Sequence, residues 1–298
     1  MLDVRRLRML REVAARGTIA ATAEALGYTP SAVSQHLIAL ERETGASLLE
    51  RDGRSVRLTD AAERLVRRTE AVLAQLEAAE AELAHGSDVR GTVTLACFPT
   101  AAATIAPTAM AAFAAAHPDA EVVMSELEPE QALPALKLGE ADVAVVHEYD
   151  FSPRGSDPGV ELRPLLEDDI LVAVPDGHPA AGENVDLAAL AGEGWVAGYL
   201  DTACHRVVVT ACRAAGYEPR ISARTNDFRV VLALVAAGRG VALVPRLAFD
   251  AAPAGVALAP ASGRPLRRRV LAAARAGGAG HPAVSALIRE LEAASARI

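Results

Sequence analysis

The sequence predicts an α/β protein in which a helical N-terminal domain and one long helix precede a larger α/β domain. Three observations lead to this fold class: a helix-turn-helix pattern in residues 18–44, a heptad repeat of apolar residues up to about residue 84, and alternating strand and helix patterns from residue 91 onward. We expect domain boundaries at residues 1–58, 59–88 and 89–298. A chain of 298 residues is long enough for two or three such domains.

The first predicted motif is a pair of helices joined by a tight turn. Ile19, Ala23 and Leu26 recur at helical spacing and supply the inner face of the first helix. After the glycine turn, Thr29 can cap the second helix, and Pro30 suits its first turn because a missing N–H has no partner there anyway. This arrangement is the pattern of a helix-turn-helix, whose second helix enters a DNA groove.

The second helix separates an apolar face from a polar one. Its inward positions are Val33, Leu37, Leu40 and Thr44. Its opposite face carries Ser31, Ser34, Gln35, Ile38 and Arg42. Hydroxyls suit phosphates, and glutamine can make a bidentate pair with adenine, so the four polar residues are expected to face DNA. A small helical hairpin with a solvated polar face is the alternative, but the turn and the arginine-bearing run that follows favour DNA.

Five short motifs follow one another over about sixty residues: Ala23-Glu24-Ala25-Leu26, Ala32-Val33-Ser34, Leu40-Glu41-Arg42-Glu43-Thr44-Gly45, Leu48-Leu49-Glu50-Arg51 and Val56-Arg57-Leu58-Thr59. Together they resemble the N-terminal signature of LysR-type transcriptional regulators. The resemblance implies a winged helix-turn-helix with residues 48–58 as the wing hairpin. We expect Gln35 on a base edge and the arginines mainly on phosphates. The predicted DNA-binding residues are Thr29, Ser31, Ser34, Gln35, Arg42, Arg51 and Arg54.

The sequence departs from the family pattern at three positions of this domain. Leu49 stands where the family usually has phenylalanine, which is a conservative change in a core position. Thr22 replaces a customary alanine on the first helix of the motif. Ile38 occupies a position where a polar or basic residue is common.

Charge distribution agrees with contact to DNA through the N-terminal domain alone. Residues 1–70 carry 12 arginines and 10 acidic residues, a net charge of +2, whereas the whole chain carries −8. The remaining residues therefore carry −10, which argues against a general nucleic-acid coat protein.

The sequence lacks the signals that are typical of several other classes of protein. The N-terminus has no apolar segment of signal-peptide length, and no uninterrupted run of 18 apolar residues occurs, so we expect a cytoplasmic protein without a membrane partner. The three cysteines have no metal-ligand spacing. No glycine-rich phosphate loop, HExxH or GxSxG motif occurs. We expect no enzyme activity, no catalytic residues, no metal and no cofactor.

One long helix is predicted after Thr59. Its apolar positions alternate steps of four and three along Leu58, Ala62, Leu65, Thr69, Val72, Leu76, Ala79 and Leu83. About 26 residues give a rod of roughly 40 Å whose apolar stripe favours a partner chain. Packing within the same chain is the alternative. The resemblance implies a linker helix that pairs antiparallel in a homodimer, with a homotetramer as the usual assembly, so that two heads read two half-sites of promoter DNA.

The remaining chain alternates strands and helices. Strands are expected at residues 92–97, 120–125, 141–147, 170–174, 194–198, 220–223, 240–244 and 267–274. Helices are expected at residues 104–116, 131–138 (interrupted at Pro134), 203–215, 227–237 and 283–296. The simplest topology returns the last strand and helix to the first half. It gives subdomain I (residues 91–160 and 266–298) and subdomain II (residues 161–265), with crossings at residues 160–163 and 262–266.

This two-lobed architecture resembles periplasmic binding proteins. The matching landmarks of the LysR-type effector domain are His178-Pro179, Asp186-Leu187, Gly216-Tyr217 and the run of residues 235–245. The resemblance therefore covers essentially the whole chain, and it implies that a small-molecule effector binds in the cleft between the subdomains.

The effector is expected at the carboxyl ends of the strands, beside helix N-termini. Thr100 offers a hydroxyl at the first such end, which favours an organic anion; the alternative, compatible role is that Thr100 caps its helix. Phe98 stands where the family often has serine, which predicts a more apolar pocket. His147 and Glu148 follow the third strand, where a solvated strand end is the alternative. The predicted effector-binding residues are Phe98, Thr100, His147, Glu148, Thr202 and Thr225.

Two other kinds of chemistry have weaker support. Asp168 and Asp169 are adjacent on a strand and point to opposite faces, so a shared acid/base site is not expected. Cys97 and Cys204 are a conceivable thiol switch, although small buried side chains are the favoured interpretation. Two further classes stay open: a constitutive DNA-binding protein whose C-terminal domain is an assembly scaffold, and an enzyme built on the two-lobed domain.

Overall fold

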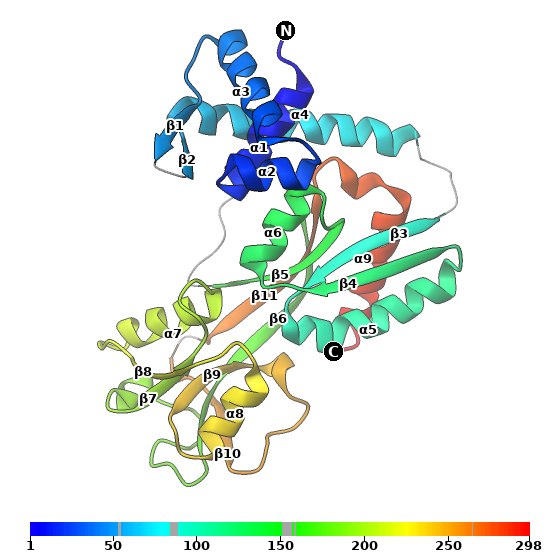
Figure 1. Ribbon diagram of the computed structural model, residues 1–298. Helices are drawn as coiled ribbons and strands as arrows, with labels where there is room; N and C mark the ends of the chain where they lie inside the picture. Colours follow the sequence, from blue (N-terminus) through cyan, green and yellow to red (C-terminus); the bar gives the residue numbers. More distant parts are fainter. Residues whose placement is uncertain (53–54, 84–88, 151–156, 158, 264) are drawn as a thin grey trace.

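The computed structural model describes residues 1–52, 55–83, 89–150, 157, 159–263 and 265–298. It consists of an N-terminal head, a long helix beneath it and a larger α/β domain (Figure 1). The head contains α1 (Val4–Arg16), α2 (Ile19–Leu26), α3 (Pro30–Thr44) and the hairpin of β1 (Leu49–Asp52) and β2 (Ser55–Leu58).

The helix-turn-helix forms as the sequence predicts. Gly27 ends α2 in the left-handed conformation at φ 68°, and the Thr29 hydroxyl accepts a hydrogen bond from the Ala32 N–H at 3.2 Å to cap α3. Residues Val33, Leu37 and Leu40 of α3 are buried in the core of the head, which α1, β1 and the start of the long helix complete. These predictions are confirmed because helix caps and helical periodicity depend on residues that are close in sequence.

The long helix is α4 (Asp60–Leu83), and its predicted apolar seam has two different environments. In the first half, Ala62 is buried in the core of the head, and Thr69 is buried as well. In the second half, Val72, Leu76 and Leu83 are 44%, 41% and 88% exposed. A separate face of α4 contacts the α/β domain of the same chain through residues such as Glu77, whose carboxylate accepts from Arg275 Nε at 3.1 Å. Intrachain packing therefore covers one face of α4 and leaves the second half of the seam open.

The α/β domain is one continuous set of hydrogen-bonded strands that falls into two half-sheets. The strands are β3 (Gly91–Cys97), β4 (Ala120–Glu126), β5 (Val143–Tyr149), β6 (Val160–Pro175), β7 (Gly194–Ala197), β8 (Arg220–Arg224), β9 (Val241–Pro245), β10 (Val256–Pro260) and β11 (Arg267–Arg275). Their order is β4-β3-β5-β11-β6-β9-β7-β8, and β10 pairs with β6. The first half-sheet contains β4, β3, β5, β11 and the first part of β6, and the second contains the rest of β6 with β10, β9, β7 and β8.

Strand β6 passes from one half-sheet to the other. Its residues 160–169 pair with β11, and its residues 170–175 pair with β9 and β10. The expected crossing at residues 160–163 is wrong, because that stretch is paired within the first half-sheet and the chain changes partner between Asp169 and Ile170. The expected return of the last strand to the first half is confirmed by the pairing of β11 with β5.

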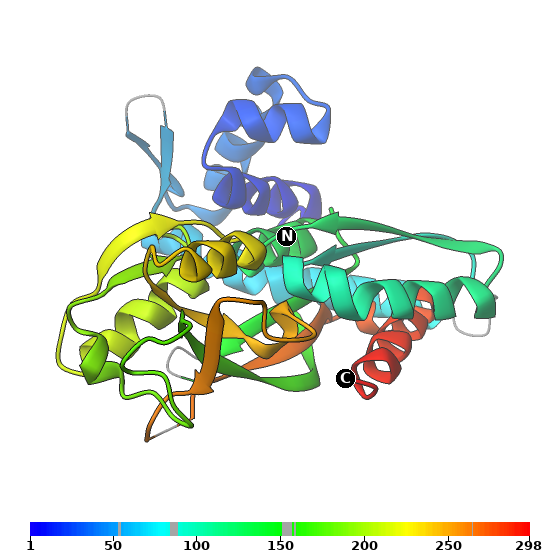
Figure 2. The ribbon, with the colours of Figure 1, turned by 90° about the horizontal axis from the view of Figure 1, so that it is seen from below.

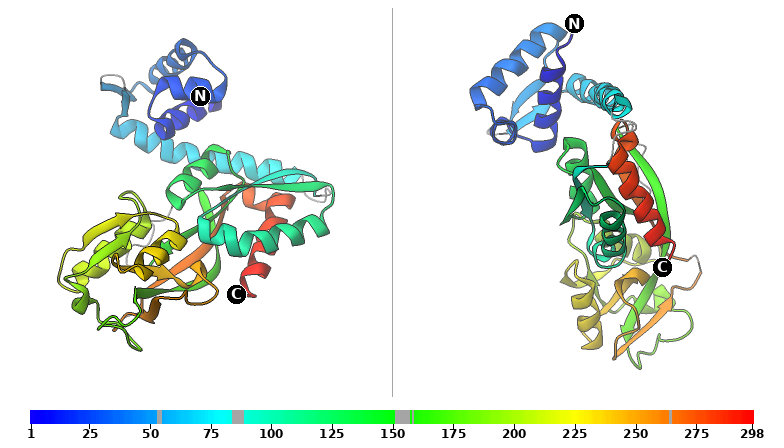
Figure 3. Two further views of the ribbon diagram at one scale, coloured as in Figure 1. Left: turned by 60° about the horizontal axis from the view of Figure 1, so that its bottom comes forward. Right: turned by 90° about the vertical axis from the view of Figure 1, so that its right-hand side faces the viewer.

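Helices cover both faces of each half-sheet. They are α5 (Pro99–Ala116), α6 (Pro129–Leu138), α7 (Ala203–Ala214), α8 (Phe228–Ala236) and α9 (Pro282–Ser295), with short 3-10 turns η1 (Leu187–Leu190), η2 (Arg246–Ala248) and η3 (Gly278–Gly280). Helices α5 and α9 pack side by side on one face of the first half-sheet, and α6 covers the other (Figure 3). In the second half, α7 and α8 cover opposite faces.

Two helices and two strands differ from expectation, and one of the strands is β6, which begins at Val160, ten residues before the expected strand. Helix α5 begins at Pro99, five residues earlier than expected, because proline is well suited to the first turn. Helix α6 continues through Pro134, which removes a single helical hydrogen bond and does not break the helix. Strand β10 is absent from the elements that the sequence predicts.

Among the described helices, α5 is the one long and apolar enough by composition to cross a membrane. Its Ile105, Ala109 and Phe113 are fully buried against the sheet and α9. The apolar character of α5 is therefore that of a core helix.

Candidate functional site

The outward face of α3 is a polar surface that the head leaves in solvent. Ser31, Gln35 and Arg42 are exposed, as the sequence predicts. Ser34 is half-buried, and its hydroxyl donates to the Pro30 carbonyl at 2.9 Å. Thr29 is exposed and its hydroxyl also serves as the cap of α3. These side chains therefore share the outer side of one helix, with Thr29, Ser31, Ser34 and Gln35 toward its N-terminus and Arg42 in its last turn.

The β1–β2 hairpin projects beside the helices of the head (Figure 2). Its antiparallel register runs from Leu49 opposite Leu58 to Asp52 opposite Ser55. Arg51 lies on β1, but its side chain is outside the described residues, and so is the whole of Arg54. The Glu41 carboxylate of α3 accepts from the backbone N–H of Leu48 at 2.8 Å and fixes the base of the hairpin. Sequence reasoning missed this contact.

The head also contacts the α/β domain of its own chain. Arg16 at the end of α1 pairs with Glu140, which follows α6. Its guanidinium also bonds the buried Glu12 at 3.0 Å. This ion pair joins the head directly to the α/β domain, and no local sequence pattern predicts it.

A buried cluster joins the two half-sheets at the first predicted effector loop. Arg268 of β11 is 1% exposed, and its guanidinium donates to Asp168 at 2.8 Å and to the Thr100 hydroxyl at 2.8 Å. The same guanidinium lies 5.0 Å from the centre of the Phe98 ring. The Asp168 carboxylate also accepts from the Leu247 N–H of η2 at 3.1 Å. The cluster therefore connects α5 and β11 of the first half-sheet with β6 and with η2, which follows β9 of the second half-sheet.

Thr100 therefore has another role than a helix cap. The N-cap position of α5 belongs to Phe98, and no side chain makes the capping hydrogen bond. Thr100 lies in the first turn and accepts from Arg268 instead. The expected capping role of Thr100 is therefore wrong. The hydroxyl accepts from Arg268, which is 168 residues away in the sequence, so no local pattern predicts this contact.

Adjacent carboxylates on β6 face opposite ways, as predicted. Asp168 is buried against Arg268, whereas Asp169 is exposed and bonds Arg267 at 2.9 Å. They form two separate ion pairs and no shared acid/base site.

His147 and Glu148 are both buried, at 1% and 7% exposure, so they are not a solvated strand end. The His147 ring contacts the ring of Phe98 edge-on, with centroids 4.7 Å apart, and the ring of Tyr149 at 5.3 Å. Glu148 points to the opposite face of β5 and pairs with Arg269. The structure therefore brings His147 and Phe98 together and places Glu148 elsewhere.

Thr202 and Thr225 use their hydroxyls to shape the chain. Thr202 caps α7, accepting from the His205 N–H at 3.3 Å and donating to the Tyr199 carbonyl at 2.7 Å. Thr225 accepts from the Asp227 N–H at 3.1 Å. Both loops lie at the carboxyl ends of strands, as expected, but the local bonds are those of caps and turns.

A cavity of about 360 Å³ lies between the two subdomains, beside the start of α5. Its lining residues are Pro99, Thr100, Ala103, Glu126, Asn226, Asp227, Phe228, Arg229, Leu247 and Ala248. Among these described lining residues, Thr100 is the sole member of the predicted effector set. The charged side chains are those of Glu126, Asp227 and Arg229, of which the last two pair at 3.2 Å.

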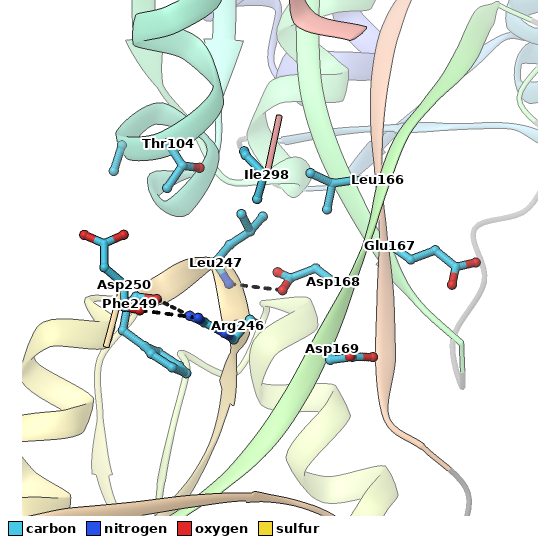
Figure 4. A pocket seen from close by; sticks show the side chains of 11 residues that line it. Thr104, Leu166, Glu167, Asp168, Asp169, Arg246, Leu247, Phe249, Asp250 and Ile298 are labelled. Carbon is cyan, nitrogen blue, oxygen red and sulfur yellow. Dashed lines mark hydrogen bonds between the residues drawn. The ribbon is translucent and has the colours of Figure 1, made fainter. Parts of the chain in front are cut away.

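A second cavity of about 580 Å³ opens behind the contact between α5 and η2 (Figure 4). Ala103 and Leu247 line both cavities, so their side chains belong to the wall between them. On the far side Arg246 donates to the carbonyls of Phe249 and Asp250, as the dashed lines in Figure 4 show. This arginine stabilises the loop after η2.

A polar cluster lies where α6 of subdomain I meets α7 of subdomain II. The Glu130 carboxylate accepts from the Ala203 N–H at 3.0 Å and from Arg206 at 2.9 Å. The Tyr149 hydroxyl lies 3.5 Å from the sulfur of Cys204. Burial, and then the charge of Glu130, raise the pKa of Glu128 to about 7.

The three cysteines form no disulfide. Burial, and then the charge of Glu128, raise the pKa of the Cys204 thiol to about 11. Burial raises the pKa of Cys97 to about 12. Cys97 and Cys212 are fully buried, whereas Cys204 is partly exposed in the first turn of α7.

Two family models match the chain. Residues 4–63 match the helix-turn-helix of bacterial regulatory proteins of the LysR family, and residues 86–296 match the LysR substrate binding domain. A probable hydrogen peroxide-inducible genes activator of Mycobacterium avium is 31% identical over 88% of this chain and 85% of its own length.

Solved structures extend the likeness to the whole fold. Full-length OxyR of Pseudomonas aeruginosa, a cysteine variant, has a TM-score of 0.67 at 22% identity and covers 98% of this chain and 95% of its own. A cysteine mutant of Corynebacterium glutamicum OxyR with bound H2O2 has a TM-score of 0.61 at 26% identity and covers 99% and 93%. The chain therefore belongs to the LysR family of bacterial transcriptional regulators, with an N-terminal DNA-binding domain and a C-terminal substrate-binding domain.

Proposed function

We propose that a small-molecule effector binds in the cavity between the subdomains and thereby changes how the protein engages promoter DNA. The observation that carries this proposal is the position of that cavity. It adjoins Thr100, which contacts the guanidinium of Arg268, and Leu247, whose N–H bonds Asp168. A ligand there would touch both ends of the buried cluster that connects the half-sheets.

The mechanism follows from which parts the cluster joins. Strand β6 is continuous through both half-sheets and changes its partner between Asp169 and Ile170, so we place the pivot between the half-sheets at this point. A ligand that binds more tightly to the conformation with one angle between the half-sheets shifts the population toward that conformation. Subdomain I carries the Arg16–Glu140 contact to the head, so a change in angle has a direct route to the DNA-binding surface.

The charges of the cavity bear on the chemistry of the effector. Asp227 and Arg229 pair with each other, which leaves Glu126 as the net charge. At the neighbouring α7, the Ala203 N–H already donates to the carboxylate of Glu130, so this helix start offers an anion one donor fewer. We therefore propose an effector that presents an amine or another hydrogen-bond donor to Glu126, in place of an anion.

For the DNA-bound form we propose a homodimer joined through the open part of the α4 seam, with a homotetramer as the larger assembly. Val72, Leu76 and Leu83 are the exposed apolar residues available for that contact. The predicted contacts of α3 and the hairpin would then reach two half-sites of a promoter. Such a protein acts in the cytoplasm, where its DNA lies.

The test is a ligand screen with a variant that fills the cavity. Amines and carboxylic acids are added to the purified full-length protein, and the melting temperature and operator affinity are recorded. Ala248→Trp should abolish the ligand-induced shift while operator binding persists. Ala115→Trp, at an exposed position on α5, is the control and should respond normally. A response that survives Ala248→Trp would place the effector elsewhere, and a protein that no ligand shifts would favour the assembly-scaffold alternative.

A second function has support from the peroxide-responsive relatives and from Cys204. Its thiolate could attack H2O2, forming a sulfenic acid and releasing hydroxide, at the boundary between the subdomains. Its raised pKa makes the thiolate rare at neutral pH, so we place this function second. Mass spectrometry after H2O2 treatment tests it: a gain of one oxygen on Cys204 and loss of the DNA response in Cys204→Ser would support oxidant sensing.

A further inference from the structure

Ile38 is the one large apolar side chain that α3 leaves in solvent among the described residues of that helix. It is 47% exposed, although Val33, Leu37 and Leu40 of the same helix are at most 2% exposed. Ile38 takes no part in the buried core of the head. The fold of the head therefore does not require an isoleucine at this position.

Helix geometry places Ile38 within the DNA-facing surface. At about 100° per residue, Ile38 lies between Ser31 and Ser34 and within about 60° of Gln35 and Arg42 around the helix axis. All four of those neighbours are polar. A single exposed apolar side chain on a protein surface is ordinary, but this one lies in the middle of a surface built to enter a groove.

The chemistry of its side chain limits the groups of DNA that Ile38 can contact. Its side chain has no donor or acceptor, so it cannot bond to phosphate oxygens or to the polar edges of bases. The thymine methyl is the apolar group that the major groove presents, and apolar side chains contact it.

We infer that Ile38 reads a thymine in each half-site through the thymine 5-methyl group. The inference rests on the proposed entry of α3 into the major groove, and it adds a specificity determinant outside the polar set. Burying one methyl group against Ile38 corresponds to about fourfold in affinity, or ~0.8 kcal/mol, in each half-site.

The experiment first selects preferred duplexes from a random library with full-length protein at one fixed salt concentration. Each thymine of the selected site is then replaced by deoxyuridine, symmetrically in both half-sites, which removes the methyl and keeps the base-pairing edge. At one position the replacement should weaken wild-type binding about fifteenfold for the two half-sites together. Ile38→Ala should bind thymine and deoxyuridine equally at that position and keep its preferences elsewhere.

Two controls separate the possible failures. Ile38→Val retains apolar contact and should still favour thymine, whereas Ile38→Ala should melt within a few degrees of wild type because the residue is outside the core. If both Ile38→Ala and wild type lose affinity equally with deoxyuridine, or if no thymine methyl matters, Ile38 does not read thymine although α3 reads DNA. If the library yields no preferred sequence, the proposed base reading by α3 is itself wrong, and the inference fails with it.

Discussion

Asp168 and Arg268 face each other across β6 and β11 as a fully buried ion pair, with each side chain 1% exposed and the nearest atoms 2.7 Å apart. One residue away on the same two strands, Asp169 and Arg267 form a second pair whose side chains are 61% and 46% exposed. The two pairs share strand register and chemistry and differ in burial. They therefore provide a matched comparison of a buried and an exposed ion pair at the junction of the subdomains.

Arg268→Met should destabilise the domain by about 3–5 kcal/mol, because it leaves the Asp168 carboxylate buried without its cation. Arg267→Met should cost no more than about 1 kcal/mol, since solvent screens the exposed pair. The single tryptophan, Trp195, is fully buried in subdomain II and reports unfolding in urea by fluorescence. Adding Asp168→Asn to Arg268→Met should restore part of the loss; equal effects of the two arginine variants would contradict the role of the buried pair.

The raised pKa of the Glu128 carboxyl predicts that the free energy of unfolding depends on pH. Its pKa rises from 4.5 to about 7, chiefly through burial and then through the charge of Glu130, although Arg268 opposes the rise. Between these two values the folded protein binds a proton that the unfolded chain does not, so the free energy of unfolding falls as pH increases through this window. The expected fall is on the order of 1 kcal/mol, because the half-buried side chain is partly screened.

Urea midpoints measured between pH 4.5 and 7.5 test this expectation. Glu128→Gln should flatten the dependence, and Glu121→Gln, at an exposed position on β4, should leave it as in wild type. A stability that rises with pH in both wild type and Glu128→Gln would mean that other groups dominate the window.

The head could be predicted from sequence because its determinants are local. Thr29 and Pro30 begin α3, Gly27 ends α2, and the apolar spacing of α3 defines the buried face without reference to distant residues. The first half of β6 escaped prediction because its charged residues resemble a loop. Its hydrogen-bond partner, β11, follows about a hundred residues later.

The proposed effector site was harder to predict for the same reason. The position of Thr100 at a strand end is visible in the sequence, but its partner Arg268 is 168 residues away. A solvated strand end is an open alternative for His147 in the sequence, yet the ring packs against Phe98, because the whole of β5 is buried between helix layers. Side-chain roles that depend on such distant pairings follow from the tertiary structure alone.

The open half of the α4 seam predicts the effect of a charge on assembly. Leu76→Arg places a cation among Val72 and Leu83, so the proposed dimer should dissociate at micromolar concentration. Sedimentation equilibrium measures the change in mass. Ala71→Arg is the matched control, because it adds the same cation at an exposed position about 100° around the helix axis from Val72, and it should leave the mass unchanged. A Leu76→Arg protein with the wild-type mass would place the dimer contact on another surface.

The two kinds of interaction proposed for α3 predict different responses to salt. Arg42→Ala should weaken binding to every duplex alike and reduce the slope of log affinity against log salt by about 0.9 for each phosphate that the arginine neutralises. Gln35→Ala should keep the slope and lose about 1–3 kcal/mol of discrimination at one base pair. Arg213→Ala, an exposed arginine of α7 paired with Glu218, should change neither quantity.

These titrations use a selected operator and its single-base variants at three or more salt concentrations. Slope and sequence preference are separate readouts, because counterion release depends on the number of phosphates neutralised, whereas discrimination depends on contacts with base edges. A Gln35→Ala protein that retains full discrimination would remove Gln35 from the base-reading set. An unchanged slope in Arg42→Ala would mean that the cations on DNA lie elsewhere in the head, and the arginines of the hairpin would be the next to substitute.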